Sequence, residues 1–301
     1  MVNFIKLNSL EDVTEILWSD GPESLLIAGG TDILVRPRPF ADMRILVDIS
    51  QVDELKRVEE REVGVLSVGA GSTHQEIVDH PLIRRRARLL QLACGSVGSF
   101  QIRNRGTLGG NLGNASPAGD SIPALVCLDA KVVLAARSRR REVDALSFFS
   151  GPGECARQID EVIESVLIPR RTGRGAAFFK KAGQRRGMCC SKASVALLAR
   201  RHTGGHLSGV RVALGAVAPT VIRVPEAERI LEGGKLTPAV IRQAAQVCTE
   251  AVRPIDDIRS TADYRQRVVG ALLCEGLFEI YDHMRKLKKR RRRKPKPRRR
   301  R

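Results

Sequence analysis

Short apolar runs bounded by glycine, proline or polar residues recur along the first half of the chain, and they predict strands. Between them lie stretches whose apolar positions recur every three or four residues, which is typical of amphipathic helices. The strands predicted here cover residues 24–30, 44–50, 62–71, 131–137 and 162–169. The predicted helices cover residues 31–37, 73–80, 87–98 and 121–130. This mixed order favours α+β lobes over a regular doubly wound sheet.

Strands and helices are also predicted in the second half of the chain, but in a different order. Strands are predicted first, at 176–182, 193–200 and 209–224 with a turn at Pro219, and two helices follow at 237–252 and 262–288. The glycine-rich run 148–161 is predicted to be a loop, and RRTGRG at 170–175 is predicted to be a linker. The domains that follow are lobe one at about 1–58, lobe two at about 59–172, a smaller C-terminal α+β domain at 173–285, and a tail at 286–301.

Charge is concentrated in that tail. The chain carries 52 Lys and Arg against 33 Asp and Glu, and its net charge is +19. The last sixteen residues hold thirteen of these bases and no acid, so the remaining body has 39 bases, 33 acids and a net charge of only +6. Like charges repel and the tail has one apolar residue, which predicts a disordered segment. It is either an arm that binds polyanions or a solvated extension without a role, and the sequence leaves both open.

Several kinds of chemistry find no support in the residues. No apolar run approaches the roughly 20 residues of a membrane span, and the acidic N-terminus is unlike a secretion signal, so a cytoplasmic location is expected. The seven cysteines form no CxxC, and neither a P-loop nor a GxSxG motif occurs. The five histidines form no triad or HExxH pattern, so we expect them at the surface or in turns. No catalytic side chain or metal site is predicted, and a cofactor would carry the chemistry.

Two glycine clusters are the strongest candidates for binding such a cofactor. Residues 28–32 read Ala-Gly-Gly-Thr-Asp and residues 107–111 read Thr-Leu-Gly-Gly-Asn. Glycine lets the backbone approach a phosphate closely, and the neighbouring polar side chains add hydrogen bonds. We therefore predict two loops on one diphosphate, with Asp120 as a carboxylate for a ribose. GAGSTH at 69–74 resembles the start of GxGxxG, but His74 replaces the third glycine, so we interpret it as a strand-to-helix turn.

A family resemblance rests on these same residues. IAGGTDILV at 27–35, the long block QIRNRGTLGGNLGNASPAGDSIPALVCLDA at 101–130 and FFKKAGQRRGMCCSKASVALLA at 178–199 follow one another in family order. Together they resemble the FAD-binding subunit of molybdenum hydroxylases, the family that includes xanthine dehydrogenase and carbon monoxide dehydrogenase. The resemblance extends to about residue 284 and excludes the tail.

The resemblance implies a vanillyl-alcohol-oxidase-type (PCMH-type) two-lobed FAD domain followed by a smaller α+β domain. It also implies FAD as the cofactor and an electron-transfer role, with [2Fe-2S] clusters in a small partner subunit, molybdopterin in a large one, and an acceptor such as NAD+. The KAGQR stretch at 181–185 favours a xanthine-dehydrogenase-like complex. The residues implied to bind FAD are Ala28, Gly29, Gly30, Thr31, Asp32, Thr107, Gly109, Gly110, Asn111, Ser116, Asp120, Lys181 and Arg185.

Two other functions remain open from the sequence. One is a stand-alone FAD-dependent oxidoreductase on the same fold, which would need its own substrate pocket. The other is a non-enzymatic polyanion-binding protein that acts through the tail.

Overall fold

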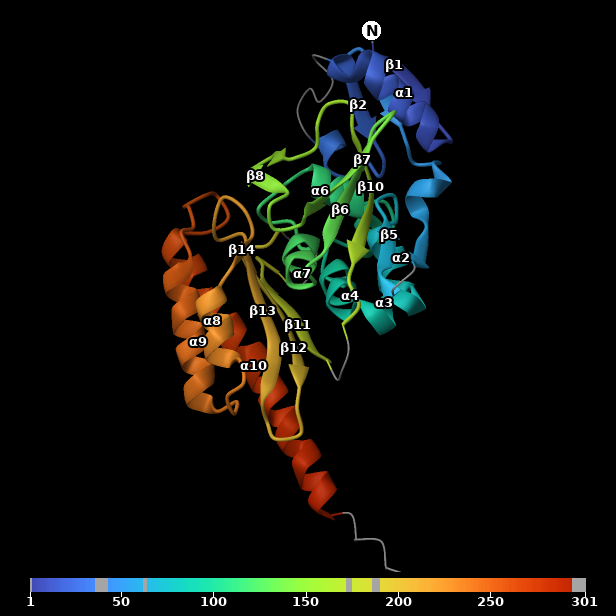
Figure 1. The fold of residues 1–301 in the computed structure, drawn as a ribbon. Coiled ribbons are helices and arrows are strands. Elements are labelled where there is room, and N and C mark those ends of the chain that lie inside the picture. The colour runs from blue at the N-terminus through green and yellow to red at the C-terminus, as the bar shows by residue number, and fades with distance from the viewer. Residues whose placement is uncertain (1, 36–42, 62–63, 172–174, 186–189, 294–301) are drawn as a thin grey trace, which may run out of the picture.

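The computed structural model describes residues 2–35, 43–61, 64–171, 175–185 and 190–293 (Figure 1). It confirms the α+β class. The first lobe is a three-stranded parallel sheet in the order β1-β3-β2, packed with one helix. Its elements are β1 (Asn3–Lys6), α1 (Leu10–Asp20), η1 (Gly21–Glu23), β2 (Ser24–Ile27), η2 (Ile33–Val35), β3 (Ile45–Asp48) and η3 (Asp53–Lys56).

The first lobe contains two elements that the pattern of residues 1–23 does not predict, β1 and α1. Helix α1 starts where the Ser9 hydroxyl accepts a hydrogen bond from the backbone N–H of Asp12, and it buries Leu10, Val13 and Leu17 on one face. The helix predicted at 31–37 is a short 3₁₀ turn, η2, over the part that the structure describes. The rest of that prediction, from residue 36, lies outside the described residues.

The second lobe is a five-stranded antiparallel sheet in the order β4-β5-β10-β6-β7, with helices packed against it. The run predicted to be a loop at 148–161 instead contains a small hairpin, β8–β9, because Gly153 adopts a φ of 81° and turns the chain back on itself. The strands are β4 (Val58–Glu60), β5 (Leu66–Gly69), β6 (Lys131–Ala135), β7 (Arg140–Asp144), β8 (Phe149–Gly151), β9 (Glu154–Cys155) and β10 (Val162–Ile168). The helices are α2 (His74–Asp79), α3 (Pro81–Arg86), α4 (Arg88–Gly95), α5 (Phe100–Arg103), α6 (Leu108–Gly113) and α7 (Ser121–Cys127).

The C-terminal part is a four-stranded antiparallel sheet in the order β11-β12-β13-β14, covered on one side by three helices (Figure 1). Side chains alternate across its strands: Val195 and Leu197 pack with these helices, whereas Ala196 joins the core of the second lobe. Burial on both faces explains why β12 reads as a continuous apolar run. The elements are β11 (Gly175–Ala182), β12 (Ala193–Arg201), β13 (Leu207–Gly215), β14 (Ile222–Arg223), α8 (Pro225–Leu231), α9 (Pro238–Ala251) and α10 (Ala262–Arg293).

Helix α10 extends past the body and into the segment assigned to the basic tail (Figure 1). We expect disorder from residue 286 onward, yet the structure continues the helix to Arg293. Lysine and arginine are good helix formers, so a helix already nucleated by its packed half propagates through them. Residues 294–301, and the predicted boundary at 172–173, lie outside the described residues. Within the described ranges, no helix is long and apolar enough to cross a membrane.

Candidate functional site

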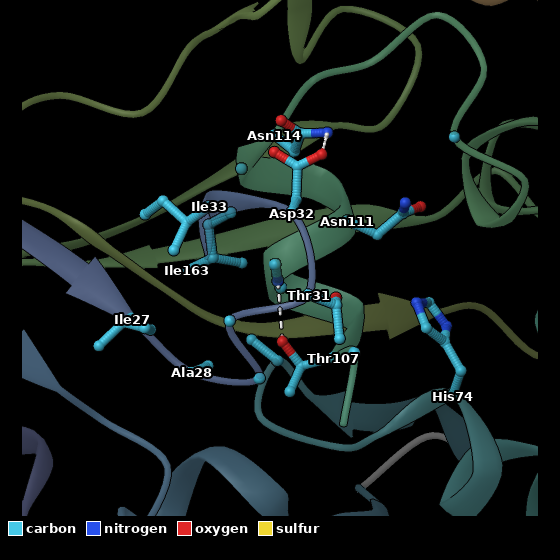
Figure 2. A pocket seen from close by; sticks show the side chains of 18 of the residues that line it. Ile27, Ala28, Thr31, Asp32, Ile33, His74, Thr107, Asn111, Asn114 and Ile163 are labelled. Atoms are coloured by element: carbon cyan, nitrogen blue, oxygen red, sulfur yellow. Dashed lines mark hydrogen bonds between the residues drawn. The ribbon is translucent and has the colours of Figure 1, made fainter. Parts of the chain in front are cut away.

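A cavity of about 570 Å³ lies between the first and second lobes, and Cys190 of the C-terminal part also lines it. The turns that follow β2 and β5 and the segment around α5 and α6 form its walls (Figure 2). The side chains of Ile27 and Ile163 make part of the wall apolar. The cavity therefore joins backbone turns rich in glycine to an apolar surface, as ligand sites commonly do.

The first glycine loop, residues 28–32, runs directly from the end of β2 and is packed against the second lobe. A Cβ on Gly29 would lie 1.8 Å from the carbonyl oxygen of Arg105, so no side chain fits there. Among the residues that the structure describes, the backbone N–H groups of Gly29, Gly30 and Thr31 find no acceptor. This loop thus supplies backbone donors at the cavity wall.

The second glycine loop, residues 107–111, forms the start of α6. Its N–H groups are used inside the protein: that of Gly109 donates to the carbonyl of Ala70 (2.7 Å), and that of Gly110 donates to the Thr107 hydroxyl (3.0 Å). A Cβ on Gly110 would meet only the Thr107 hydroxyl oxygen, at 2.9 Å. We expected both loops to offer N–H groups to a phosphate. The second instead offers a bare backbone surface.

Polar side chains connect the two loops. The Asn114 amide donates to the Asp32 carboxylate at 3.2 Å, which links the first loop to the end of α6 (Figure 2). The Asn111 carbonyl accepts from the Ser121 hydroxyl at 2.6 Å, and this bond orients the Asn111 side chain at the cavity wall. The Ser116 hydroxyl accepts from the backbone N–H of Ala118 at 3.3 Å. The turn between α6 and α7 is held in place in this way.

Asp120 is a buried carboxylate at the wall, and residues of the C-terminal part hold it. Its oxygens lie 2.5 Å from the Lys181 Nζ, 2.5 Å from the Ser191 hydroxyl and 3.4 Å from the Ser96 hydroxyl. Burial raises the pKa of Asp120 above its ordinary value, and the attraction of Lys181 and the serine hydrogen bonds offset part of this rise. A buried ion pair and a serine hydrogen bond therefore connect this wall of the cavity to the C-terminal part.

The candidate residues of the two loops, together with Ser116 and Asp120, all line the cavity. Lys181 and Arg185 are not among the lining residues. Lys181 lies near the end of β11 and contacts Asp120 without lining the cavity itself. Arg185 is exposed in the turn that follows β11. The structure thus brings eleven candidates together at the wall and places the remaining two outside it.

The turn after β5 contributes residues that the sequence did not indicate. Gly71 and His74 line the cavity. We expect the histidines at the surface or in turns; His74 does follow the turn between β5 and α2, but it is only 2% exposed and so does not lie at the surface. Burial, and to a lesser degree Arg103, lowers the pKa of His74 to about 4. The GAGSTH stretch at 69–74 was the available signal, and its interpretation as a strand-to-helix turn is confirmed by β5 and α2. No cluster of metal-binding side chains occurs in the part of the chain that the structure covers.

Comparisons with protein families cover nearly all of this architecture. Residues 1–171 match the FAD binding domain in molybdopterin dehydrogenase, and residues 177–280 match the CO dehydrogenase flavoprotein C-terminal domain. The first match ends at the end of the second lobe, and the second match begins near the start of the C-terminal four-stranded sheet.

Individual relatives match over most of their length. The chain is 32% identical to the nicotine 6-hydroxylase medium subunit of Paenarthrobacter nicotinovorans, covering 90% of this chain and 94% of that protein. It is 30% identical to the xanthine dehydrogenase FAD-binding subunit of Escherichia coli O157:H7, covering 88% and 90%.

Solved structures are also similar to this chain over most of its length. A chain of carbon monoxide dehydrogenase from Hydrogenophaga pseudoflava superimposes with a TM-score of 0.86 at 28% identity, covering 92% of this chain and 96% of that one. A chain of quinoline 2-oxidoreductase from Pseudomonas putida 86 gives 0.86 at 27% identity, with 94% and 98% covered.

Proposed function

The chain belongs to the family of FAD-binding medium subunits of molybdenum hydroxylases, and from this premise we propose that it transfers electrons within such a complex. The observation that carries the proposal is the cavity between the lobes, which both glycine loops line. FAD is the cofactor of this family, and the residues at the wall fit it. When bound, FAD accepts electrons and passes them to an acceptor.

The two glycine loops would contribute to FAD binding in different ways. The N–H groups of Gly29, Gly30 and Thr31 would donate to the diphosphate, because they have no acceptor in the described part of the chain. Gly110 would let the extended cofactor lie directly against α6, where a side chain would fill the space. Asn111 and Ser116 would add side-chain hydrogen bonds.

Asp120 is proposed to accept a hydrogen bond from a ribose hydroxyl. An ionised carboxylate has about four acceptor positions, and the described residues occupy three of them. Lys181 would act through Asp120 by holding its carboxylate at the wall, and its charge would also favour an anionic reduced cofactor. Arg185, four residues further along, is proposed to face the same cofactor from the turn after β11.

The proposed partners are a small iron–sulfur subunit with [2Fe-2S] clusters, a large molybdopterin subunit and an acceptor such as NAD+. We favour a xanthine-dehydrogenase-like complex because the KAGQR stretch at 181–185 resembles such members and the relative from Escherichia coli O157:H7 carries that name. We also propose that residues 1–172 bind FAD, that 173–285 form the second domain, and that the tail takes no part in binding.

Two measurements test this proposal. The full-length chain, purified from cells, should show the visible absorption bands of flavin, and a flavin-free folded chain that does not take up FAD would contradict it. Co-purification should then recover an iron–sulfur subunit and a molybdopterin subunit. The complex should oxidise xanthine with NAD+ faster than nicotinate or carbon monoxide. Turnover by the chain without any partner would favour a stand-alone oxidoreductase instead.

A further inference from the structure

His74 is a buried histidine that the predicted cofactor residues do not include. It is the first residue of α2, which begins where the Thr73 hydroxyl and the Glu76 carboxylate each accept a backbone hydrogen bond from the other residue. The backbone N–H of His74 also donates to the carbonyl of Gly106 at 2.9 Å. The backbone of His74 is therefore held next to Gly106, which precedes the second glycine loop, and only 2% of the residue is exposed.

The two edges of the ring face different surroundings. Nδ1 lies 3.5 Å from the sulfur of Cys94 on α4, inside the core of the second lobe. The opposite edge faces Gly106: a Cβ placed on that glycine would lie 3.4 Å from Cδ2 of His74, and 3.2 Å from the hydroxyl of Thr31. Cδ2 is bonded to Nε2, so this edge of the ring lies next to Gly106, whose Cβ position is also close to Thr31 of the first glycine loop. Figure 2 shows the ring directed into the cavity, on the side of Asn111.

Nε2 makes no hydrogen bond within the described ranges and is not one of their fully enclosed unpaired atoms, so it is open to the cavity that His74 lines. A polar atom at a cavity wall loses its hydrogen bond to water when a ligand fills the cavity, and about 1–3 kcal/mol is lost unless the ligand offers a partner. Thr31 and His74 line the cavity together, so a ligand in this part of the cavity would lie beside both side chains. A ligand acceptor between the first loop and Gly106 would supply the hydrogen bond that Nε2 does not make within the described residues.

The ring carries a single proton, and its neighbours decide where. Burial lowers the pKa of His74 to about 4, so the imidazole is neutral near pH 7. Burial raises the pKa of Cys94, so this residue keeps its S–H. An S–H group that donates to Nδ1 leaves the ring proton on Nε2, which becomes a donor.

We propose that His74 donates a hydrogen bond from Nε2 to an oxygen of the FAD diphosphate, between the first glycine loop and Gly106. This inference rests on the proposed function, because it needs FAD in the cavity. It adds a side-chain donor where the second loop provides none through its own N–H groups. Cys94 is then a positioning residue that selects the tautomer of His74.

The test is FAD binding by the full-length chain, stripped of flavin and titrated with FAD, with flavin fluorescence as the readout. His74→Phe keeps a ring but removes the donor, and it should raise the Kd about 10- to 150-fold, the range for a hydrogen bond to a charged group. His74→Gln places an N–H close to the position of Nε2 and should stay within about tenfold of the natural chain. If the phenylalanine variant does not fold, His74→Asn serves the same purpose, because its amide is too short to reach.

Phosphorus NMR of the bound FAD locates the acceptor. One diphosphate resonance should shift between the natural chain and His74→Gln or His74→Asn. A Kd within twofold of the natural value in His74→Phe or His74→Asn would overturn the inference, and so would equal losses in these variants and in His74→Gln. Unchanged phosphorus resonances would remove the diphosphate as the partner. Failure of the natural chain to bind FAD would instead refute the proposed function.

Discussion

The buried pair of Asp120 and Lys181 allows a quantitative prediction about how the C-terminal part is attached to the cavity. The side chains are 7% and 13% exposed, and their charged atoms lie 2.5 Å apart. Lys181→Met removes the lysine charge and leaves a buried carboxylate with two serine partners. Breaking a buried pair from one side costs about 3–5 kcal/mol, so we expect the free energy of unfolding to fall by about that amount near neutral pH.

The pH dependence of this loss follows from the pKa of Asp120. Burial raises that pKa in the folded chain, and it rises further once Lys181 no longer favours the charged form. A carboxyl group with a raised folded pKa contributes full stability below its unfolded pKa and loses that contribution as pH rises through the folded pKa. The deficit of Lys181→Met should therefore grow as pH rises above the ordinary carboxyl pKa of about 4 and shrink as pH falls back toward it.

The assay is urea unfolding followed by circular dichroism, at neutral pH and at an acidic pH close to that ordinary value. Lys180→Met is the matched control, because Lys180 is the adjacent residue of β11 and pairs with the exposed Glu275 and Glu279. It should cost at most about 1 kcal/mol at either pH. The combined change with Asp120→Asn should recover part of the loss, since it neutralises the stranded carboxylate. The reasoning is refuted if Lys181→Met matches Lys180→Met, or if its deficit does not change with pH.

Three further predictions concern the cavity and the tail. Gly110→Leu should purify without flavin, because its side chain would displace the Thr107 hydroxyl, 2.9 Å from its Cβ, and occupy the cavity; full flavin content in the folded variant would contradict the cavity assignment. Gly29→Ala should also lower the free energy of unfolding, by at least about 1–3 kcal/mol, because its Cβ would overlap the Arg105 carbonyl. Asp120→Asn should weaken FAD binding by about 1.5–3 kcal/mol, as measured by titration of the stripped chain, and an unchanged Kd would remove Asp120 from the site. Deletion of 286–301 should leave the flavin-to-protein ratio unchanged and strongly reduce salt-sensitive heparin retention; loss of flavin would show that the tail is structural.

Much of the fold follows from local pattern, because burial on one or both faces leaves a direct trace in the order of apolar residues. The strands of the C-terminal four-stranded sheet and the helices α9 and α10 lie where their apolar periodicity predicts them. Short elements in polar or glycine-rich runs are not predicted by apolar periodicity. Helices α5 and α6 and the hairpin β8–β9 depend on caps such as Thr107 and on contacts with distant segments, and these contacts override weak propensity.

Some residues of the candidate site could likewise be predicted from local sequence, and others could not. The amino-acid sequence alone determined the two glycine loops and Asp120 as cavity residues, because a backbone that must approach another group closely requires glycine at that position whatever surrounds it. Only the tertiary structure decided that Lys181 holds Asp120, 61 residues away, and that His74 lies against Cys94, 20 residues away. Such pairings depend on which buried surfaces meet when the lobes pack, and a polar atom acquires its partner, its pKa and its role only in that environment.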